Sequence, residues 1–337
     1  MKIPVIMMFN DNYSIPSGVA ILSLLTNAKR NHFYELYILH NDISEAHQNM
    51  IKTIVSKFEN AKLEFKNMHN KLCDISIQNY PKELLYKFCL SSIFPNLDYA
   101  IVTDVDVVFV DDISEEFCNF VKTENYYFAG VKQIQEINHS KFSLNIKDNN
   151  MHYLCGAGYM IYNLSSMRLN NIEEKCIEYY KQNQSYCKYP DQDVLNQVCY
   201  PNIKLIHSKN MMLTNLYKNK EKISKDKLYS YTANLIEVEE AFQNPVQLHY
   251  VESENIGKPW FDVFAPKAEY WWSYVVKTSF YNEAFQRLLK YQIGLEKSKY
   301  NHFIEYIFSS KELYENNIKR KCVTILGFKI KLKKNYI

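Results

Sequence analysis

Hydrophobic and polar positions in the first third of the chain follow two alternating periods. Short apolar runs at residues 3–9, 36–40 and 63–65 are typical of buried strands. Helix signals separate them, because Ser14 opens one apolar segment and Ser44 caps another with apolar residues at helical spacing. Such repeated alternation predicts an α/β fold, in which a mostly parallel sheet carries helices on both faces.

The next apolar run, residues 99–110, contains two carboxylates at Asp104 and Asp106. Residues i and i+2 of a strand point to the same side, so both can converge on one hard divalent cation. Ligands of such sheets bind beyond the carboxyl ends of strands, which is where Asp104 falls. Asp-x-Asp is a short motif, and a second copy starts at Asp191. A solvated turn is the alternative, but the flanking strands favour a metal site.

The second half of the chain has a less regular pattern. Residues 132–152 are predicted to form a polar loop, long enough for a lid or a binding loop. Beyond Pro266 the pattern becomes helical and aromatic. Between these segments we predict a strand, two helices and a last short strand at 157–163, 165–182, 193–199 and 247–250.

Composition indicates a globular protein with a substantial core. Of 337 residues, 47% are hydrophobic and only 7 are glycine, which excludes a low-complexity chain. The 8 cysteines form no C-x-x-C pair, so we expect reduced thiols in a cytoplasmic protein. The apolar start meets polar Asn10 without a small-residue cleavage site, which favours a strand over a signal peptide. No apolar run reaches the ~18 residues of a membrane span.

The net charge of +3 is unevenly distributed. Residues 319–337 contain seven basic and no acidic side chains, which leaves 33 Lys and Arg against 37 Asp and Glu elsewhere. Anionic lipid attracts such a segment by about 1 kcal/mol per basic residue near the surface. We therefore expect this tail to bind the inner face of the cytoplasmic membrane peripherally. A solvated charge run or a final strand near residue 330 are the alternatives. The acidic body, which carries no nucleic-acid motif, disfavours nucleic acid.

Further polar segments surround the two carboxylates in a recognisable order. They are Asn10-Asp11-Asn12-Tyr13, Gly156-Ala157-Gly158, Asp191-Gln192, and His249 followed by Lys258. With these motifs, residues 3–260 resemble the retaining glycosyltransferases of family 8, especially bacterial lipopolysaccharide galactosyl- and glucosyltransferases. The resemblance implies a GT-A fold, a UDP-hexose donor, a glycolipid or oligosaccharide acceptor, and Mn²⁺ with Mg²⁺ as the alternative.

The resemblance also implies roles for individual residues. Asp104, Asp106 and His249 would hold the metal, and an imidazole ligand suits Mn²⁺ better than Mg²⁺. Asp191 and Gln192 would lie beside the donor sugar as catalytic residues. An amide is a poor nucleophile, so we expect front-side attack by the acceptor hydroxyl, with Gln192 stabilising positive charge. The implied donor-binding set is Asn10, Asp11, Asn12, Tyr13, Lys87, Asp104, Val105, Asp106, Gly156, Ala157, Gly158, Asp191, Gln192, His249, Gly257 and Lys258.

Two positions depart from the family pattern. Lys87 stands where arginine is usual, which keeps the charge but loses the planar fork. The spacing from His249 to Lys258 is longer than usual, with residues 252–255 between them.

Several of these residues also have plain structural interpretations. Residues 10–13 can form an Asx-type turn, and the glycines near residue 157 can form a bulge. His249 alone would more often be a core histidine, Lys258 a surface lysine, and Asp193 a helix cap.

The expected domain organisation has three parts. Residues 1–265 would form the GT-A domain, 266–318 a helical extension, and 319–337 the tail. Two other functions stay open, namely an Mg²⁺-dependent phosphoryl-transfer enzyme and a glycan-binding or assembly protein with a degenerate site. No pattern indicates the oligomeric state.

Overall fold

The computed structural model describes residues 1–69, 71–72, 75, 77, 80–123, 125–132, 151, 153–219, 235–252, 257–315, 318–325 and 328–332. Most of the loop predicted at residues 132–152 lies outside this set, as do residues 253–256. The chain divides into two compact units, Met1–Asn282 and Glu283–Ile337, which are described separately.

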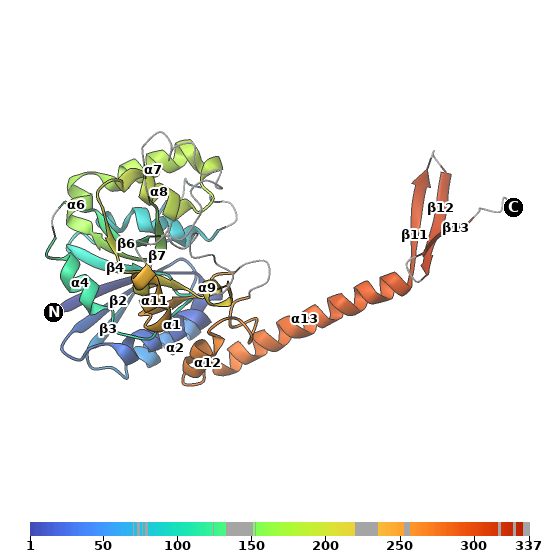
Figure 1. Ribbon diagram of the computed structural model, residues 1–337, viewed down its shortest axis with the longest axis horizontal. Coiled ribbons are helices and arrows are strands. Elements are labelled where there is room, and N and C mark those ends of the chain that lie inside the picture. The colour runs from blue at the N-terminus through green and yellow to red at the C-terminus, as the bar shows by residue number, and fades with distance from the viewer. Residues whose placement is uncertain are drawn as a thin grey trace. The chain divides into compact units, whose positions relative to one another are not determined.

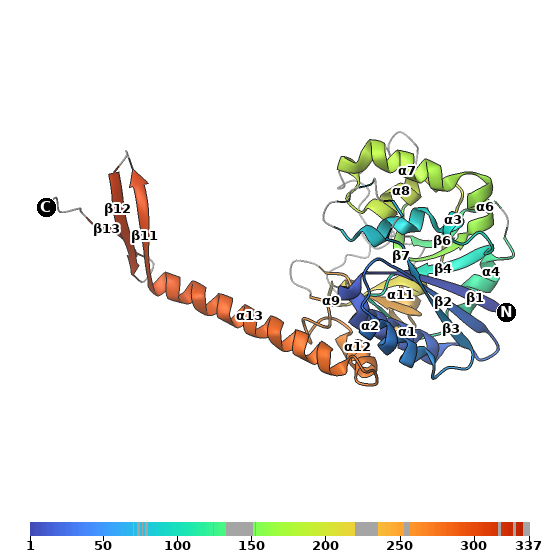
Figure 2. The same cartoon turned by 180° about the vertical axis from the view of Figure 1, so that it is seen from behind.

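A seven-stranded sheet is the framework of the first unit (Figures 1 and 2). Its strand order is β3-β2-β1-β4-β7-β6-β8. Neighbours are parallel except at β7, which is antiparallel to both β4 and β6. The prediction of a mostly parallel α/β sheet is therefore confirmed. The strands are β1 Lys2–Met8, β2 Phe33–His40, β3 Ala61–Asn67, β4 Tyr99–Thr103, β6 Phe128–Lys132, β7 Cys155–Asn163 and β8 Ile203–Ile206.

Helices cover both faces of this sheet (Figures 1 and 2). On one face lie α1 Ser14–Asn27 and α2 Glu45–Val55, and the Ser44 hydroxyl caps α2 by accepting from His47 N. On the other face lie α3 Leu90–Ile93, α6 Leu164–Leu169, α7 Ile172–Asn183 and α8 Pro190–Cys199. In β1 every residue but the first is buried, and in β7 all nine residues are buried. This burial explains why both strands have a continuous apolar pattern.

Two helical segments of this unit are not single continuous α-helices. The segment after Pro81 forms a 3₁₀ helix, η2 Lys82–Phe88, before the short α3. The helix expected at 165–182 is broken into α6 and α7 by Asn171, which adopts a left-handed φ of 53°. The strands β6 and β8 were not predicted, because each is short and gains its stability from pairing rather than from its own pattern.

A second, three-stranded sheet lies beside the end of β4. It consists of β5 Val107–Phe109, β10 Gln247–His249 and β9 Met212–Leu213. β10 is antiparallel to β5, and His249 pairs with Val107. The register thus places a histidine from late in the chain directly beside the Asp-x-Asp turn. The remaining elements of this unit are η1 Asp11–Tyr13, α4 Ser114–Phe120, η3 Gln184–Tyr186, η4 Ser208–Met211, α9 Asn215–Asn219, α11 Leu235–Gln243 and α12 Ala268–Val275.

The second unit contains most of helix α13 Tyr281–Ile307 and a small antiparallel sheet (Figure 1). The sheet joins β11 Phe308–Glu315, β12 Ile318–Ile325 and β13 Phe328–Leu332. The helix ends at Ile307, before the expected boundary at residue 318, and the segment that follows is a strand. The tail itself includes β12 and β13, which matches the strand alternative. Within the described part of the chain, no helix has the length and apolarity of a membrane span.

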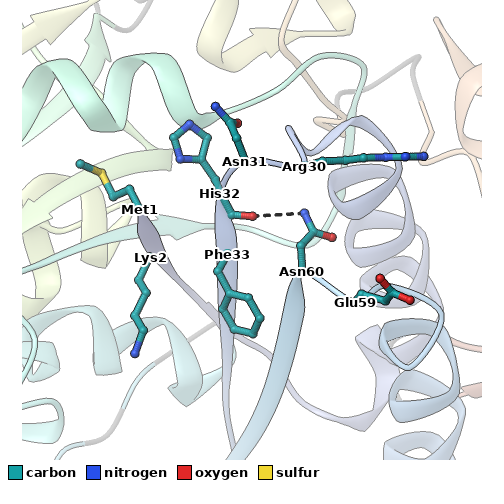
Figure 3. A pocket seen from close by; sticks show the side chains of 8 residues that line it. All are labelled: Met1, Lys2, Arg30, Asn31, His32, Phe33, Glu59 and Asn60. Atoms are coloured by element: carbon teal, nitrogen blue, oxygen red, sulfur yellow. Dashed lines mark hydrogen bonds between the residues drawn. The ribbon is translucent and has the colours of Figure 1, made fainter.

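One cavity of about 410 Å³ opens at the amino-terminal ends of β1, β2 and β3 (Figure 3). None of the predicted site residues lines it. Asn60 donates from its side chain to His32 O across 3.3 Å at this cavity. Its lining residues are Met1, Lys2, Arg30, Asn31, His32, Phe33, Glu59 and Asn60.

Candidate functional site

Two backbone hydrogen bonds fix the turn that carries Asp104 and Asp106, between the end of β4 and the start of β5. Asp104 N donates to Gly158 O across 3.1 Å, which anchors the turn to β7. Tyr250 N donates to Asp106 O across 2.9 Å, which anchors it to the residue after β10. The two aspartates are therefore held from both sides.

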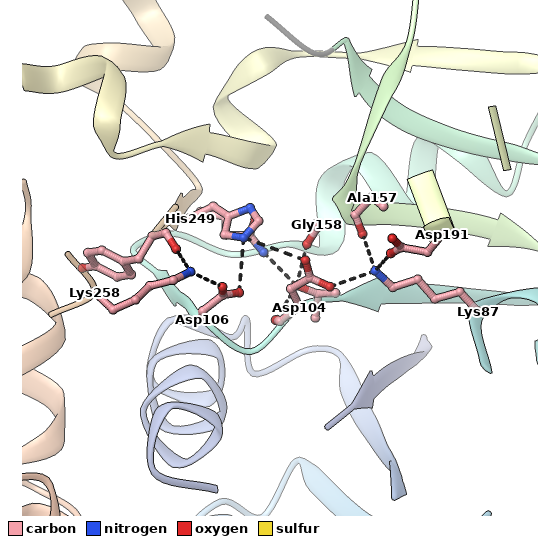
Figure 4. Close-up of polar contacts among 11 residues, drawn as sticks. Lys87, Asp104, Asp106, Ala157, Gly158, Asp191, His249 and Lys258 are labelled. Atoms are coloured by element: carbon pink, nitrogen blue, oxygen red, sulfur yellow. Dashed lines mark hydrogen bonds and ion pairs between the residues drawn. The ribbon is translucent and has the colours of Figure 1, made fainter. Parts of the chain in front are cut away.

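His249 faces both carboxylates (Figure 4). Its Nε2 lies 3.2 Å from Asp106 Oδ1 and 3.8 Å from Asp104 Oδ2. One ligand atom from each of the three residues lies within 4.8 Å of the others. Two hard oxygens and one imidazole nitrogen form a donor set that fits a divalent cation such as Mn²⁺.

Gly158 leaves the space that the His249 ring occupies. A Cβ at this position would lie 2.5 Å from both Cε1 and Nδ1 of His249. His249 Nδ1 is buried and has no hydrogen-bond partner within the described residues. Packing against a glycine, rather than a hydrogen bond to Nδ1, therefore sets the orientation of the ring.

Two lysines extend the cluster into a row of alternating charges (Figure 4). Lys258 Nζ lies 2.5 Å from Asp106 Oδ2 and also donates to Tyr250 O. At the other end, Lys87 Nζ lies 2.8 Å from Asp104 Oδ1. Each aspartate thus gives one oxygen to a lysine and turns the other toward His249.

The surroundings shift the pKa values of the two aspartates in opposite directions. Burial raises the pKa of Asp106, but the charges of Lys258 and His249 outweigh it and hold the pKa below its usual value. Burial also raises the pKa of Asp104, and Lys87 offsets this only in part, so that pKa stays above normal.

Helix α8 begins beside this row. Asp191 Oδ2 lies 2.6 Å from Lys87 Nζ, and the side-chain Nε2 of Gln192 is buried without a partner in the described chain. Asn196 accepts from Cys155 N at 2.7 Å and donates to Cys155 O at 2.8 Å, which ties α8 to β7. Sequence reasoning assigned no role to Asn196, although it lies one helical turn after Gln192.

The side chains of the segment after β1 contact two different parts of the molecule. Asp11 Oδ1 accepts from Ser44 N at 2.9 Å and lies 2.7 Å from His47 Nδ1, so Asp11 joins the start of α2. Tyr13 instead packs edge-on against Trp260, with ring centroids 6.2 Å apart. Burial, with the charge of Asp106, raises the pKa of the Tyr13 phenol.

The other predicted donor-binding residues have the following places. Asn12 is exposed, whereas Asn10 Oδ1 is buried without a partner in the described chain. Val105 is buried between the two aspartates. Ala157 O accepts from Lys87 at 2.9 Å, and Gly156 precedes it within β7. A Cβ at Gly257 would lie 2.8 Å from the Asp262 Cβ, so glycine allows the tight turn before Lys258.

Asp193 lies one position after Gln192 on α8. Its Oδ2 accepts from Tyr189 N at 2.9 Å, as a carboxylate that closes the first turn of a helix does. This contact fits the interpretation of Asp193 as a cap.

Comparison with known proteins gives one family match. A family model described as Glycosyl transferase family 8 matches residues 4–263. A lipopolysaccharide 1,2-glucosyltransferase of Escherichia coli is 24% identical over 308 residues, which cover 88% of this chain and 84% of that protein. A Haemophilus influenzae protein is 26% identical over 209 residues, which cover 59% of this chain and 60% of that protein.

Solved structures share the fold at low sequence identity. The bifunctional glycosyltransferase WbbM has a TM-score of 0.69 and 20% identity, over 86% of this chain and 52% of WbbM. The galactosyltransferase LgtC, solved with donor and acceptor sugar analogues, has a TM-score of 0.64 and 18% identity, over 82% of this chain and 96% of LgtC. The chain thus matches little more than half the length of WbbM and of the Haemophilus protein.

Proposed function

Because the chain belongs to glycosyl transferase family 8, we propose that it transfers galactose or glucose from a UDP-sugar to a hydroxyl of a bacterial surface glycolipid, with retention of configuration. The observation that carries the proposal is the convergence of Asp104, Asp106 and His249 at the end of β4. Three residues from two distant parts of the sequence meet with the donor set that a divalent cation requires.

A divalent cation, Mn²⁺ before Mg²⁺, would be held by these three side chains. When bound, it supplies positive charge that neutralises the diphosphate of a nucleotide-sugar. Lys258 supports this role because its ammonium group, next to Asp106, is a flexible point charge. In this proposal, Lys258 binds the diphosphate of the donor and exchanges its ion pair with Asp106 for one with the phosphate oxygens.

The start of α8 supports front-side attack. Asp191 directly precedes Gln192, and its ion pair with Lys87 lowers its ability to act as a nucleophile. Gln192 keeps a buried amide N–H₂ without a partner in the described chain, which can donate to the oxygen atoms of a sugar. In this proposal, the acceptor hydroxyl attacks the anomeric carbon, its proton passes to the leaving UDP oxygen, and no covalent glycosyl-enzyme forms.

The second unit supports a location at the inner face of the cytoplasmic membrane. Residues 283–337 contain twelve Lys and Arg against five Asp and Glu. On α13, Phe285, Leu289 and Ile293 recur at a spacing of four and are 44%, 44% and 51% exposed. Apolar residues along one helix face, within a basic segment, are typical of helices that lie in an anionic bilayer surface.

Sedimentation with phosphatidylglycerol vesicles tests this location. Replacing Phe285, Leu289 and Ile293 with serine should lower the bound fraction several-fold, whereas replacing the exposed Leu169 and Val263 of the first unit should not. Equal binding by both variants would contradict the proposal.

The activity is tested by release of UDP from a panel of UDP-sugars, with Mn²⁺ and with a chelator. We expect turnover of one donor, which the chelator abolishes, and a loss of at least ~100-fold in Asp104→Asn. No turnover across the panel, together with no binding of any donor by calorimetry, would contradict the proposal.

A further inference from the structure

Lys87 is the most enclosed charged residue of the site. Its side chain is 0% exposed, and it belongs to η2 between the buried Tyr86 and Phe88. Lysine is rarely buried to this degree, because removal of an ammonium group from water is costly unless partners compensate for it. The reason for burying this lysine must lie in its partners.

Those partners use the full hydrogen-bonding capacity of the ammonium group. Nζ lies 2.8 Å from Asp104 Oδ1, 2.6 Å from Asp191 Oδ2 and 2.9 Å from Ala157 O. An ammonium group carries three N–H donors. With three acceptors and no exposed surface, the Lys87 ammonium group has nothing left to offer a substrate.

The three partners belong to three different elements. Asp104 follows β4 and faces His249 with its second oxygen. Asp191 is the second residue of α8, next to Gln192, and Ala157 lies in β7. A single ammonium group therefore connects a candidate metal ligand to the start of the helix that carries the candidate catalytic amide.

We propose that Lys87 is a positioning residue, which orients Asp104 toward the metal and fixes Asp191, and that it does not bind the donor. This departs from the role that the family resemblance implies for the position. The inference rests on the proposed function only in that a divalent cation binds at Asp104, Asp106 and His249.

Titration with Mn²⁺ alone separates positioning from donor contact. A donor contact has no effect when the donor is absent, whereas a positioning residue acts on the metal site directly. We expect Lys87→Met to weaken Mn²⁺ binding about 10-fold or more, as removal of a group that orients a metal ligand does. Lys87→Arg keeps a buried cation that can donate to both aspartates, and should stay within about 3-fold of the wild type.

Asp191→Asn is the matched control. It removes the charge on the far side of Lys87 but leaves the contact with Asp104, so Mn²⁺ affinity should stay within about 3-fold while the transfer rate falls. If Lys87→Met does not fold, as shown by circular dichroism, Lys87→Gln takes its place with the same expected direction.

The possible outcomes are distinct. Unchanged Mn²⁺ affinity in Lys87→Met or Lys87→Gln, with a raised KM for the donor, would overturn the inference and restore a donor contact. Absence of Mn²⁺ binding by the wild type would instead overturn the proposed metal site itself.

Discussion

At each end of the charged row a lysine is paired with an aspartate, but the two lysines differ in burial and in their contacts. At one end Lys87 is completely buried, contacts three acceptors and lies on η2 within the core. At the other end Lys258 contacts one carboxylate and one carbonyl, and it follows Gly257 on a turn beside Trp260. Lys258 thus compensates one aspartate, Asp106, whereas Lys87 compensates two, Asp104 and Asp191.

The difference between the two ends teaches how one cluster can be both rigid and responsive. A buried ammonium group that bridges two carboxylates fixes geometry, because any movement would leave charges unpaired in a medium of low dielectric constant. A lysine at a turn can exchange Asp106 for a phosphate at small cost. We infer that the Lys87 end is the scaffold of the site and the Lys258 end is its variable part.

The largest expected effect is on the free energy of unfolding. Lys87→Met should lower it by about 3–5 kcal/mol, because the buried Asp191 and the partly buried Asp104 lose their shared cation. Lys258→Met should lower it by about 1–2 kcal/mol, because only one carboxylate loses its lysine and Asp106 keeps its contact with His249. Urea denaturation of both variants measures the difference. Equal losses would contradict the distinction between scaffold and variable part.

Gly158→Ala tests whether packing, rather than a hydrogen bond, sets the His249 ring. A clash at 2.5 Å should lower the free energy of unfolding by about 1–3 kcal/mol and weaken Mn²⁺ binding by about 10-fold. Thermal unfolding and calorimetry measure the two effects.

The double variant Gly158→Ala, His249→Ala provides the control. It should regain most of the lost stability, because the clash is gone, but not the Mn²⁺ affinity. No recovery of stability would mean that the glycine matters for another reason.

Asp193 shows the effect of burial on a carboxyl outside these two pairs. Burial, with the charge of Asp191 adding to it, raises the pKa of Asp193 to about 7. Because this folded-state pKa is higher than the unfolded value of 3.8, the folded state binds more protons between the two values. Asp193 therefore costs stability progressively as pH rises from about 4 to 7.

Asp193→Asn should remove that cost while keeping the oxygen that accepts from Tyr189 N. We expect the variant to be more stable than the wild type by about 1–2 kcal/mol at pH 8, with no difference near pH 3. Urea denaturation across this range measures the trend. A wild type that gains stability relative to Asp193→Asn as pH rises would contradict the assigned pKa.

The sequence predicted the framework and the centre of the site for clear physical reasons. Buried parallel strands are continuously apolar, so β1, β2 and β4 could be recognised directly. The Asp-x-Asp turn was visible because ionised groups interrupt such a run. By contrast, β11 and β12 depend on pairing between segments that carry no strong periodicity of their own, and the predicted helical region extended too far.

The roles of Lys87 and Asp11 were harder to predict, because both depend on distant partners. The acceptors of Lys87 are separated from it by up to 104 residues, and its burial follows from all three together. Asp11 was expected to bind the donor. It contacts Ser44 and His47 at the start of α2, which the sequence did not indicate, and its donor contact stays a prediction. Residue type indicates what a side chain can do, but tertiary contacts decide which capacity stays available.

The most direct test of the account is pulsed electron paramagnetic resonance of the full chain loaded with Mn²⁺. We predict coupling of the bound Mn²⁺ to one histidine nitrogen, which disappears in His249→Ala. Coupling that persists in His249→Ala, or bound Mn²⁺ without any coupled histidine nitrogen, would contradict the site at Asp104, Asp106 and His249.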